Sequence, residues 1–417
     1  KNAEILCKEL AEEHVIMKKD HNLSIHGNRA EGEGMRSPRA GVMEVNMEKL
    51  SMEKICKEIA PKFALEGTLT EAIPYGSGHI NDTVRLTCEL ENGKQKRYIL
   101  QRMNDDIFKN PVELMENVMN VTSFLRKKIE ERGGDPERET LNVIRTVDGK
   151  NFLKDEDGDF WRTYIFIENA TSLDMVRTPE DFYNSAVAFG NFQLLLQDYP
   201  AATLHETIPN FHNTVSRFAD FKKAVEEDVC GRAKEVQDEI CFVMEREADT
   251  HVICDALAKG EIPLRVTHND TKLNNIMIDN ETGKGICVID LDTVMPGSAL
   301  YDYGDSIRFG ASTGAEDEKN LDLVNCDMGL FEIYTKGYVE GCGGSLTEKE
   351  IRMMPMGAKL MTLECGMRFL ADYLQGDVYF KIHRPEHNLD RARTQFKLVA
   401  DMEKKWDEMA GIVEKYL

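Results

Sequence analysis

Short runs of apolar side chains recur between residues 67 and 167, and their spacing predicts β-strands. Residues 83–90 are the clearest run, because every second side chain is apolar and the others are polar. Asn92-Gly93 then supplies the residues that a tight hairpin turn prefers, and the next strand follows at 97–102. Three further strands are expected at 67–75, near Phe152 and at 161–167. The pattern predicts a small antiparallel sheet.

Apolar positions at helical spacing dominate the chain after Glu168. One long helix also interrupts the strands. It opens at Pro111, a residue suited to a first helical turn, and extends to about Glu130. A capping box at Thr347-Glu-Lys-Glu350 opens another helix. Further helices are expected at 50–63, 180–197, 232–259 and 388–416. A small β-rich lobe followed by a larger helical lobe makes the predicted fold class α+β.

The first 46 residues do not fit either lobe. Residues 21–46 combine several glycines and a proline with charged side chains and few apolar ones, which is typical of a flexible link. We therefore expect a flexible N-terminal extension at 1–46, an N-lobe at 47–167 and a C-lobe at 168–417. No function is assigned to the extension.

Composition excludes several classes of protein. The 417 residues are 41% hydrophobic, which is enough for two or three domain-sized cores. No run approaches the ~18 apolar residues of a membrane span, and residues 1–20 lack the apolar core of a signal peptide. The ten cysteines include no Cys-x-x-Cys pair, which argues against a zinc site or a redox dithiol and fits a reducing cytoplasm.

The net charge of −22 makes nucleic acid and anionic membranes poor partners. We expect a small-molecule substrate instead, and a monomer or small homo-oligomer. An acidic protein can still accept a cationic substrate, so charge alone leaves the substrate class open.

The candidate chemistry is concentrated in Val266-Thr-His-Asn-Asp-Thr-Lys-Leu-Asn-Asn275 and Cys287-Val-Ile-Asp-Leu-Asp292. Residues 276–290 read as a hairpin, which returns Asp290 to the side of Asn275. Asp270, Asn275 and Asp290 would then face one point. Phosphoryl transfer needs such a set: an aspartate that orients the attacking hydroxyl, and hard oxygen ligands for Mg²⁺ bound with ATP. We expect Asp270 to be catalytic and Asn275 and Asp290 to bind the metal.

These motifs resemble the kinase-like phosphotransferases that include aminoglycoside phosphotransferases and choline kinases. Their pattern is His-x-Asp-x-x-x-x-Asn followed by an Ile-Asp-Trp/Phe-Glu-like segment, where this chain has Leu291-Asp292 in place of the aromatic-Glu pair. The strings H-N-D-T-K-L-N-N, I-D-L-D-T-V-M-P-G and Y-D-Y-G-D-S-I-R-F-G resemble the narrower group of bacterial N-acetylhexosamine 1-kinases. The resemblance extends from about Ile73 to the C-terminus. It implies a protein-kinase-like two-lobe fold.

A nucleotide site is expected in the N-lobe. Gly76-Ser77-Gly78 joins the first two strands, and glycines there let backbone N–H groups approach phosphate oxygens, although an ordinary hairpin loop is the alternative. The third strand carries no lysine in its body. By resemblance, Arg102 binds the phosphates, with Glu116 as its partner. Lys272 is a further candidate for the γ-phosphate.

The resemblance also implies an acceptor site for an amino sugar. It places Arg368 and Tyr379 against the hexosamine, with Asp270 at the reacting anomeric hydroxyl; a structural salt bridge of Arg368 is the competing interpretation. Other acceptors remain open: an aminoglycoside, choline, homoserine or another sugar. A nucleotide-binding pseudokinase is a further alternative, which the intact set of Asp270, Asn275 and Asp290 disfavours.

Overall fold

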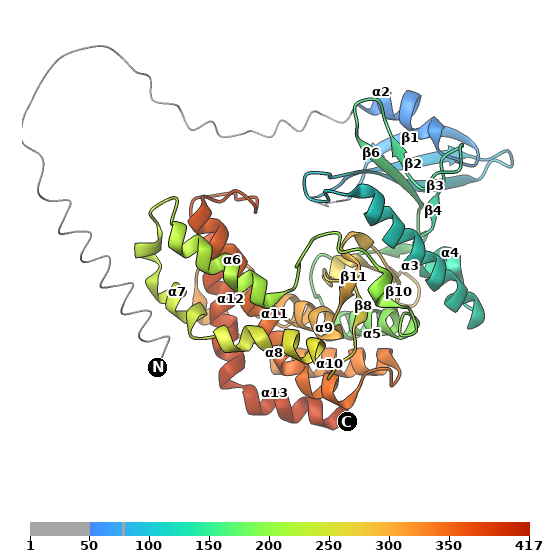
Figure 1. Ribbon diagram of the computed structural model, residues 1–417. Helices are drawn as coiled ribbons and strands as arrows, with labels where there is room; N and C mark the ends of the chain where they lie inside the picture. Colours follow the sequence, from blue (N-terminus) through green and yellow to red (C-terminus); the bar gives the residue numbers. More distant parts are fainter. Residues whose placement is uncertain (1–50, 77–79) are drawn as a thin grey trace, which may run out of the picture.

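The computed structural model describes residues 51–76 and 80–417. The N-terminal extension expected at 1–46 therefore lies outside the described residues. Figure 1 shows an antiparallel sheet set against a larger assembly of helices. The observed architecture is therefore α+β, as the sequence predicts.

The sheet has strand order β1-β2-β3-β6-β4, and β5 also pairs with β6. All of these pairs are antiparallel. The four longer strands match the predicted ones to within two residues at each end. The strands are β1 Thr68–Pro74, β2 Asp82–Glu89, β3 Gln95–Met103, β4 Val143–Ile144, β5 Leu153–Lys154 and β6 Phe160–Ile165.

The two faces of this sheet have different neighbours. Val84, Leu100 and Trp161 pack in one cluster with Ile55 and Ile59 from the segment that precedes β1. We call this side the outer face. Side chains alternate along a strand, so positions 83, 101 and 162 project to the opposite side, here called the cleft face. The sequence predicts one helix at 50–63, but the segment is three short pieces: α2 Met52–Lys54, the π-turn η1 Ile55–Ile59 and the 3₁₀ turn η2 Ala60–Lys62.

Helix α3, Pro111–Glu131, runs along the sheet and borders the helical lobe (Figure 1). Asn110 caps its first turn, since its side chain accepts a hydrogen bond from the backbone N–H of Glu113. Leu114, Val118 and Val121 of α3 belong to the same buried cluster as residues of the C-lobe. The two lobes therefore share one hydrophobic core. The short α4, Pro136–Glu139, follows.

The C-lobe is mainly helical. The helix expected at 232–259 is two helices, because the chain leaves helical geometry at Arg246, which binds Glu403. The helix expected at 388–416 is likewise interrupted at Lys405, whose ammonium binds the carbonyl of Cys326. Such tertiary contacts override local periodicity. The helices are α5 Pro179–Leu195, α6 Thr214–Glu227, α7 Gln237–Met244, α8 Glu247–Ala258, α9 Ala299–Gly310, α10 Met328–Cys342, α11 Glu348–Gln375, α12 His387–Lys404 and α13 Trp406–Val413.

Small strands in the C-lobe carry the predicted chemistry. The hairpin expected at 276–290 is present as β9 and β10, which pair Val288 with Ile276. A short strand from the start of the C-lobe joins β9, and β8 pairs with β11. These strands are β7 Ala170–Thr171, β8 Arg265–Thr267, β9 Ile276–Asp279, β10 Gly285–Val288 and β11 Met295–Gly297. Throughout 51–76 and 80–417, every helix is too short or too polar to cross a bilayer.

Candidate active site

The loop after β8 is held in place by a buried carboxylate. Asp302, on α9, accepts hydrogen bonds from the backbone N–H groups of His268 (3.0 Å) and Asn269 (2.8 Å). Gln193 donates a third, at 2.9 Å. Burial raises the pKa of Asp302, and these hydrogen bonds oppose that shift. Asp302 is thus a brace for the loop rather than a reacting group.

Two more contacts fix the rest of the loop. Asp305, held by Arg308 at 2.8 Å, accepts from the backbone N–H of Thr271 at 3.0 Å. The ring of His268 is fully buried, and its Nε2 lies 2.9 Å from the carbonyl oxygen of Ile289. His268 therefore connects the loop to the end of β10.

Asp270, Lys272 and Asn275 meet on this loop. Nδ2 of Asn275 donates to the backbone oxygen of Asp270 (2.8 Å) and to its Oδ2 (3.2 Å). The ammonium of Lys272 lies 2.8 Å from Oδ1 of Asp270. Asn269, just before, has φ of +65°, an uncommon left-handed conformation that changes the direction of the chain immediately before Asp270. The loop therefore presents a carboxylate and a cation together.

The hairpin brings Asp290 to the same place. The backbone N–H of Ile289 donates to the carbonyl of Asn275 at 2.9 Å, so Asp290 follows directly beside Asn275. Asp290 has φ of +57°, an uncommon conformation for aspartate that is often found at functional sites. Desolvation between the lobes and the negative charges of Asp292 and Asp270 raise the pKa of Asp290. Because Asp290 remains exposed, repulsion among the carboxylates is the better-supported cause.

This donor set fits a divalent cation. Asn275 and Asp290 offer amide and carboxylate oxygens, the ligands that Mg²⁺ prefers, and a cation would relieve the repulsion at Asp290. Within the part of the chain that the structure describes, no three His, Cys, Asp or Glu side chains form a group that could hold a metal alone. A metal bound here would therefore also need ligands from phosphate oxygens.

Arg102 and Glu116 do not form the expected pair. Arg102 projects to the outer face of the sheet, where its guanidinium binds Asp82 at 2.6 Å and Asp159 at 3.2 Å. Glu116 instead lies 2.8 Å from Nε2 of His205. The expectation that these two residues act together is wrong, because side-chain alternation in β3 turns Arg102 away from the cleft face.

A different arginine occupies the cleft face. Arg162 on β6 is buried, and its Nη1 lies 2.5 Å from Oδ1 of Asp292. Its Nε and Nη2 donate to Oε1 of Gln101 at 3.0 and 2.9 Å. Asn81, at the start of the sheet's second strand, donates to Oδ2 of Asp292 at 2.7 Å. Arg162 is not among the predicted site residues, although a charged side chain within the apolar run 160–167 is a signal that a partner exists.

The predicted phosphate loop is only partly within the described residues. Gly76 has φ of +80°, a conformation that favours glycine, and a Cβ at this position would meet no atom within 4 Å. Ser77 and Gly78 lie outside the described residues. The open space over Gly76 is compatible with close approach of a ligand.

Arg368 and Tyr379 lie together on the wall of a C-lobe cavity of about 340 Å³. The guanidinium of Arg368 lies 5.2 Å from the ring centre of Phe211, 5.8 Å from that of Tyr379 and 5.4 Å from that of Phe380. Asp372 fixes this wall by accepting from the backbone N–H groups of residues 378–380. None of the ion pairs of the described residues involves Arg368, which disfavours the structural salt bridge.

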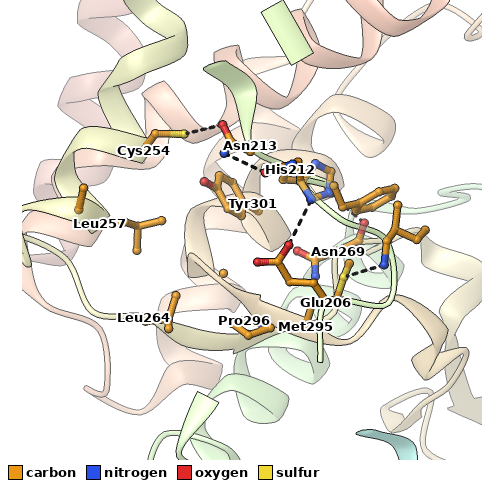
Figure 2. Close-up of a pocket in the computed structure, with 15 residues that line it drawn as sticks. Glu206, His212, Asn213, Cys254, Leu257, Leu264, Asn269, Met295, Pro296 and Tyr301 are labelled. Atoms are coloured by element: carbon orange, nitrogen blue, oxygen red, sulfur yellow. Dashed lines mark hydrogen bonds between the residues drawn. The ribbon is translucent and has the colours of Figure 1, made fainter. Parts of the chain in front are cut away.

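A second cavity, of about 430 Å³, is lined in part by Asn269 of the loop that follows β8 (Figure 2). Residues of α8 face β11 across it, and His212 forms part of its wall. Nδ1 of His212 lies 2.9 Å from Glu364, and Nε2 lies 3.1 Å from the carbonyl oxygen of Asn269. Ile208 lines both cavities, so the segment 206–213 lies between them. Through His212 the same segment contacts the loop that carries Asp270.

Residues 71–324, more than half of the chain, match the sequence profile of the phosphotransferase enzyme family. An aminoglycoside phosphotransferase from Alicyclobacillus acidocaldarius is similar in structure at TM-score 0.53 and 13% identity, over 86% of this chain and 95% of that one. The microcompartment-associated aminopropanol kinase is similar at TM-score 0.52 and 14% identity, over 86% of this chain and 98% of that one. Amicoumacin kinase hAmiN is similar at TM-score 0.51 and 11% identity, over 82% of this chain and 91% of that one. These similarities confirm the kinase-like fold. With the profile match, they show that the chain belongs to the phosphotransferase enzyme family.

Proposed function

We propose that this protein is an ATP- and Mg²⁺-dependent kinase that phosphorylates the anomeric hydroxyl of N-acetylhexosamines. The observation that carries the proposal is the meeting of Asp270, Asn275 and Asp290 at one point between the lobes. Amicoumacin kinase, a structural neighbour, was solved in complex with AMP-PNP and Ca²⁺, which supports a nucleotide and a divalent cation here.

Each residue of the set has a separate role in the proposal. Asp270 orients the acceptor hydroxyl and takes its proton late in the transfer. Asn275 and Asp290 bind Mg²⁺, which supplies positive charge to the phosphate oxygens when bound. Lys272, now paired with Asp270 at 2.8 Å, is close enough to neutralise the transferred group. Gly76, Ser77 and Gly78 cover the phosphates from the N-lobe.

The acceptor binds, in this proposal, in the cavity of Arg368 and Tyr379. The face of an aromatic ring packs well on the apolar face of a sugar ring, and a guanidinium donates several N–H groups to hydroxyl or acetamido oxygens. Arg217 lines the same cavity, and burial together with the charge of Arg368 lowers its pKa. Asp220, Lys223 and Glu227 line the same cavity, so its charges are largely balanced, and the preference for an amino sugar rests on the ring of Tyr379 and the guanidinium of Arg368.

A coupled ADP-release screen tests the proposal. The acceptors are N-acetylglucosamine, N-acetylgalactosamine, glucose, choline, homoserine and an aminoglycoside, each with ATP and Mg²⁺. We expect turnover with the two N-acetylhexosamines only, and ³¹P NMR should identify a sugar 1-phosphate. Turnover with a cationic acceptor alone would reject the sugar assignment. Nucleotide binding without ATP consumption on any acceptor would favour a pseudokinase, and Asp270→Asn serves as the inactive control.

A further inference from the structure

Gln101 projects to the cleft face of β3, the strand that carries the phosphate-binding lysine in protein kinases. Gln101 pairs directly with Thr83 on β2 and with Arg162 on β6 in the sheet register. Its Nε2 donates to Oγ1 of Thr83 at 3.1 Å. Its Oε1 accepts hydrogen bonds from Nε and Nη2 of Arg162. Gln101 thus has no charge to offer a phosphate. Its contacts instead fix the orientation of Arg162.

The guanidinium of Arg162 has no freedom to bind a phosphate itself. Its side chain is 1% exposed, and three of its nitrogens already donate to Gln101 and Asp292. It also lies 5.2 Å from the ring centre of Tyr164. Burying a charge in this way costs desolvation free energy unless the charge is paired in good geometry. One well-attested use of buried ion pairs is to fix the position of one structural element relative to another.

Asp292 has both of its carboxylate oxygens engaged by the N-lobe. Arg162 binds Oδ1 at 2.5 Å, and Asn81 binds Oδ2 at 2.7 Å. Asn81 is in turn fixed at its own Oδ1, which accepts from the backbone N–H of Asn104 at 3.0 Å. Two residues before Asp292 in the chain is Asp290, which has a left-handed backbone and belongs to the candidate metal site.

We propose that Arg162 and Asn81 are positioning residues that act through Asp292 to hold the sheet at a fixed distance from Asp290. The inference rests on the proposed binding of Mg²⁺ and nucleotide at Asp290. Asn81 directly precedes β2 and Asp292 lies two residues after Asp290, so one carboxylate connects the sheet to the candidate metal site. The connection does the positioning that a lysine on β3 and a helix glutamate perform in protein kinases.

Binding of Mg²⁺–AMP-PNP by calorimetry is the primary test, because it does not depend on knowing the acceptor. The variants are Asn81→Ala, Asp292→Asn and the double variant, together with Arg162→Lys. Arg246→Lys is the matched control, since Arg246 forms a bidentate pair with Glu403 (2.9 and 2.8 Å) far from the cleft. Loss of a hydrogen bond to a charged group should weaken nucleotide affinity roughly ten- to a hundred-fold in Asn81→Ala.

The double variant separates positioning through Asp292 from a general loss of stability. Asparagine at 292 offers one oxygen instead of two, so removal of the Asn81 amide should have little further effect in that background. Kinetics on the best acceptor should show reduced kcat/KM for ATP with an acceptor KM within twofold of the parent. Arg246→Lys should lower the melting temperature without changing nucleotide affinity.

Three results would overturn the inference: parent-like Mg²⁺–AMP-PNP affinity in a folded Asn81→Ala protein, additive effects in the double variant, or an equal loss of affinity in Arg246→Lys. If Arg162→Lys does not fold, Asn81→Ala decides the question alone, because that side chain is partly exposed and its loss leaves the Arg162 pair intact. An absence of turnover on amino sugars would count against the proposed acceptor, whereas these binding measurements would still test the connection.

Discussion

At the scale of single residues, four of the five aspartates between positions 270 and 302 illustrate four different environments. Asp302 accepts two backbone N–H groups and is buried, whereas Asp292 is enclosed by two N-lobe donors. Asp270 pairs with Lys272, and Asp290 remains exposed beside two other carboxylates. Both oxygens of Asp270 have partners, but these come from its own loop and its side chain is partly exposed, so Asp270 and Asp290 are the two that a ligand can reach. The neighbours of each carboxylate, rather than its residue type, therefore determine its chemistry.

Asp270→Asn should lower kcat by about 10²–10⁴ while Mg²⁺–ATP affinity stays close to that of the parent. An amide keeps the shape but cannot accept the proton of the acceptor hydroxyl, and this side chain orients the acceptor rather than the nucleotide. Steady-state kinetics and calorimetry measure the two quantities separately. Turnover near the parent value would show that another group acts as the base.

Asp290→Ala should remove the Mg²⁺-dependent part of nucleotide binding. Water cannot replace the lost carboxylate without leaving the charge of the phosphates less well compensated. Calorimetry with and without Mg²⁺ provides the comparison, and Asp322→Ala is a control, since Asp322 is exposed on a distant 3₁₀ turn. Equal Mg²⁺–ATP affinity in Asp290→Ala and the parent would contradict the metal assignment.

Arg368→Ala should raise the KM for an N-acetylhexosamine much more than the KM for ATP. The loss of hydrogen bonds from a charged donor costs on the order of 1.5–3 kcal/mol, or roughly a ten- to hundred-fold loss in acceptor kcat/KM. Arg368→Lys keeps the charge but not the planar set of donors, so it should recover only part of the loss. A destabilised enzyme with an unchanged acceptor KM would place the sugar elsewhere.

At the scale of helices and strands, local sequence patterns correctly predict the elements whose formation depends on residues close together in the chain. The alternation at 83–90 identified β2, and the turn residues around Gly283 identified the hairpin that joins Asn275 to Asp290. The two errors have different causes. The expectation for Arg102 disregards side-chain alternation within its own strand, whereas the partner that gives Arg162 its role, Asp292, lies 130 positions away. No periodicity in one strand can reveal such a partner.

The crossing of α5 and α10 provides a prediction about packing. A Cβ at Gly190 would lie 2.4 Å from the carbonyl oxygen of Tyr338, so Gly190→Ala must push the helices apart. Overpacking of this kind costs typically 1–3 kcal/mol, and the melting temperature should fall. Gly411→Ala is the matched control, because a Cβ there meets nothing within 4 Å and alanine favours a helix by up to about 1 kcal/mol. Equal melting temperatures for the two variants would contradict the observed close approach.

At the scale of the whole molecule, the lobes are joined by more than a linker. Their largest buried cluster includes Met103 and Tyr164 of the sheet, α3, and the helices around α5 and α10. Asn117 of α3 adds hydrogen bonds to the carbonyls of His205 and Val294 in the C-lobe, at 2.8 and 3.1 Å. A continuous core and polar contacts of this kind favour unfolding of both lobes in one cooperative transition.

The two tryptophans make that cooperativity measurable, since Trp161 lies in the sheet and Trp406 at the start of α13. Trp406→Phe leaves a fluorescence probe in the N-lobe, and Trp161→Phe leaves one in the C-lobe. Within each single-tryptophan protein, the fluorescence melt should coincide with the loss of helical circular dichroism. Separate midpoints for the two signals would show that the lobes unfold independently.

A nucleotide that bridges the lobes should shift the whole transition and not one lobe alone. A ligand at 100 times its Kd stabilises the folded state by about 2.7 kcal/mol, and in a cooperative molecule that free energy is shared by every residue. Mg²⁺–AMP-PNP should therefore raise the midpoint reported by Trp161 and by Trp406 equally. The same addition to Asp290→Ala should produce a much smaller shift of both midpoints, because the Mg²⁺-dependent part of the binding is lost. A shift seen by Trp161 alone would mean that the nucleotide binds the sheet without engaging the carboxylates of the C-lobe.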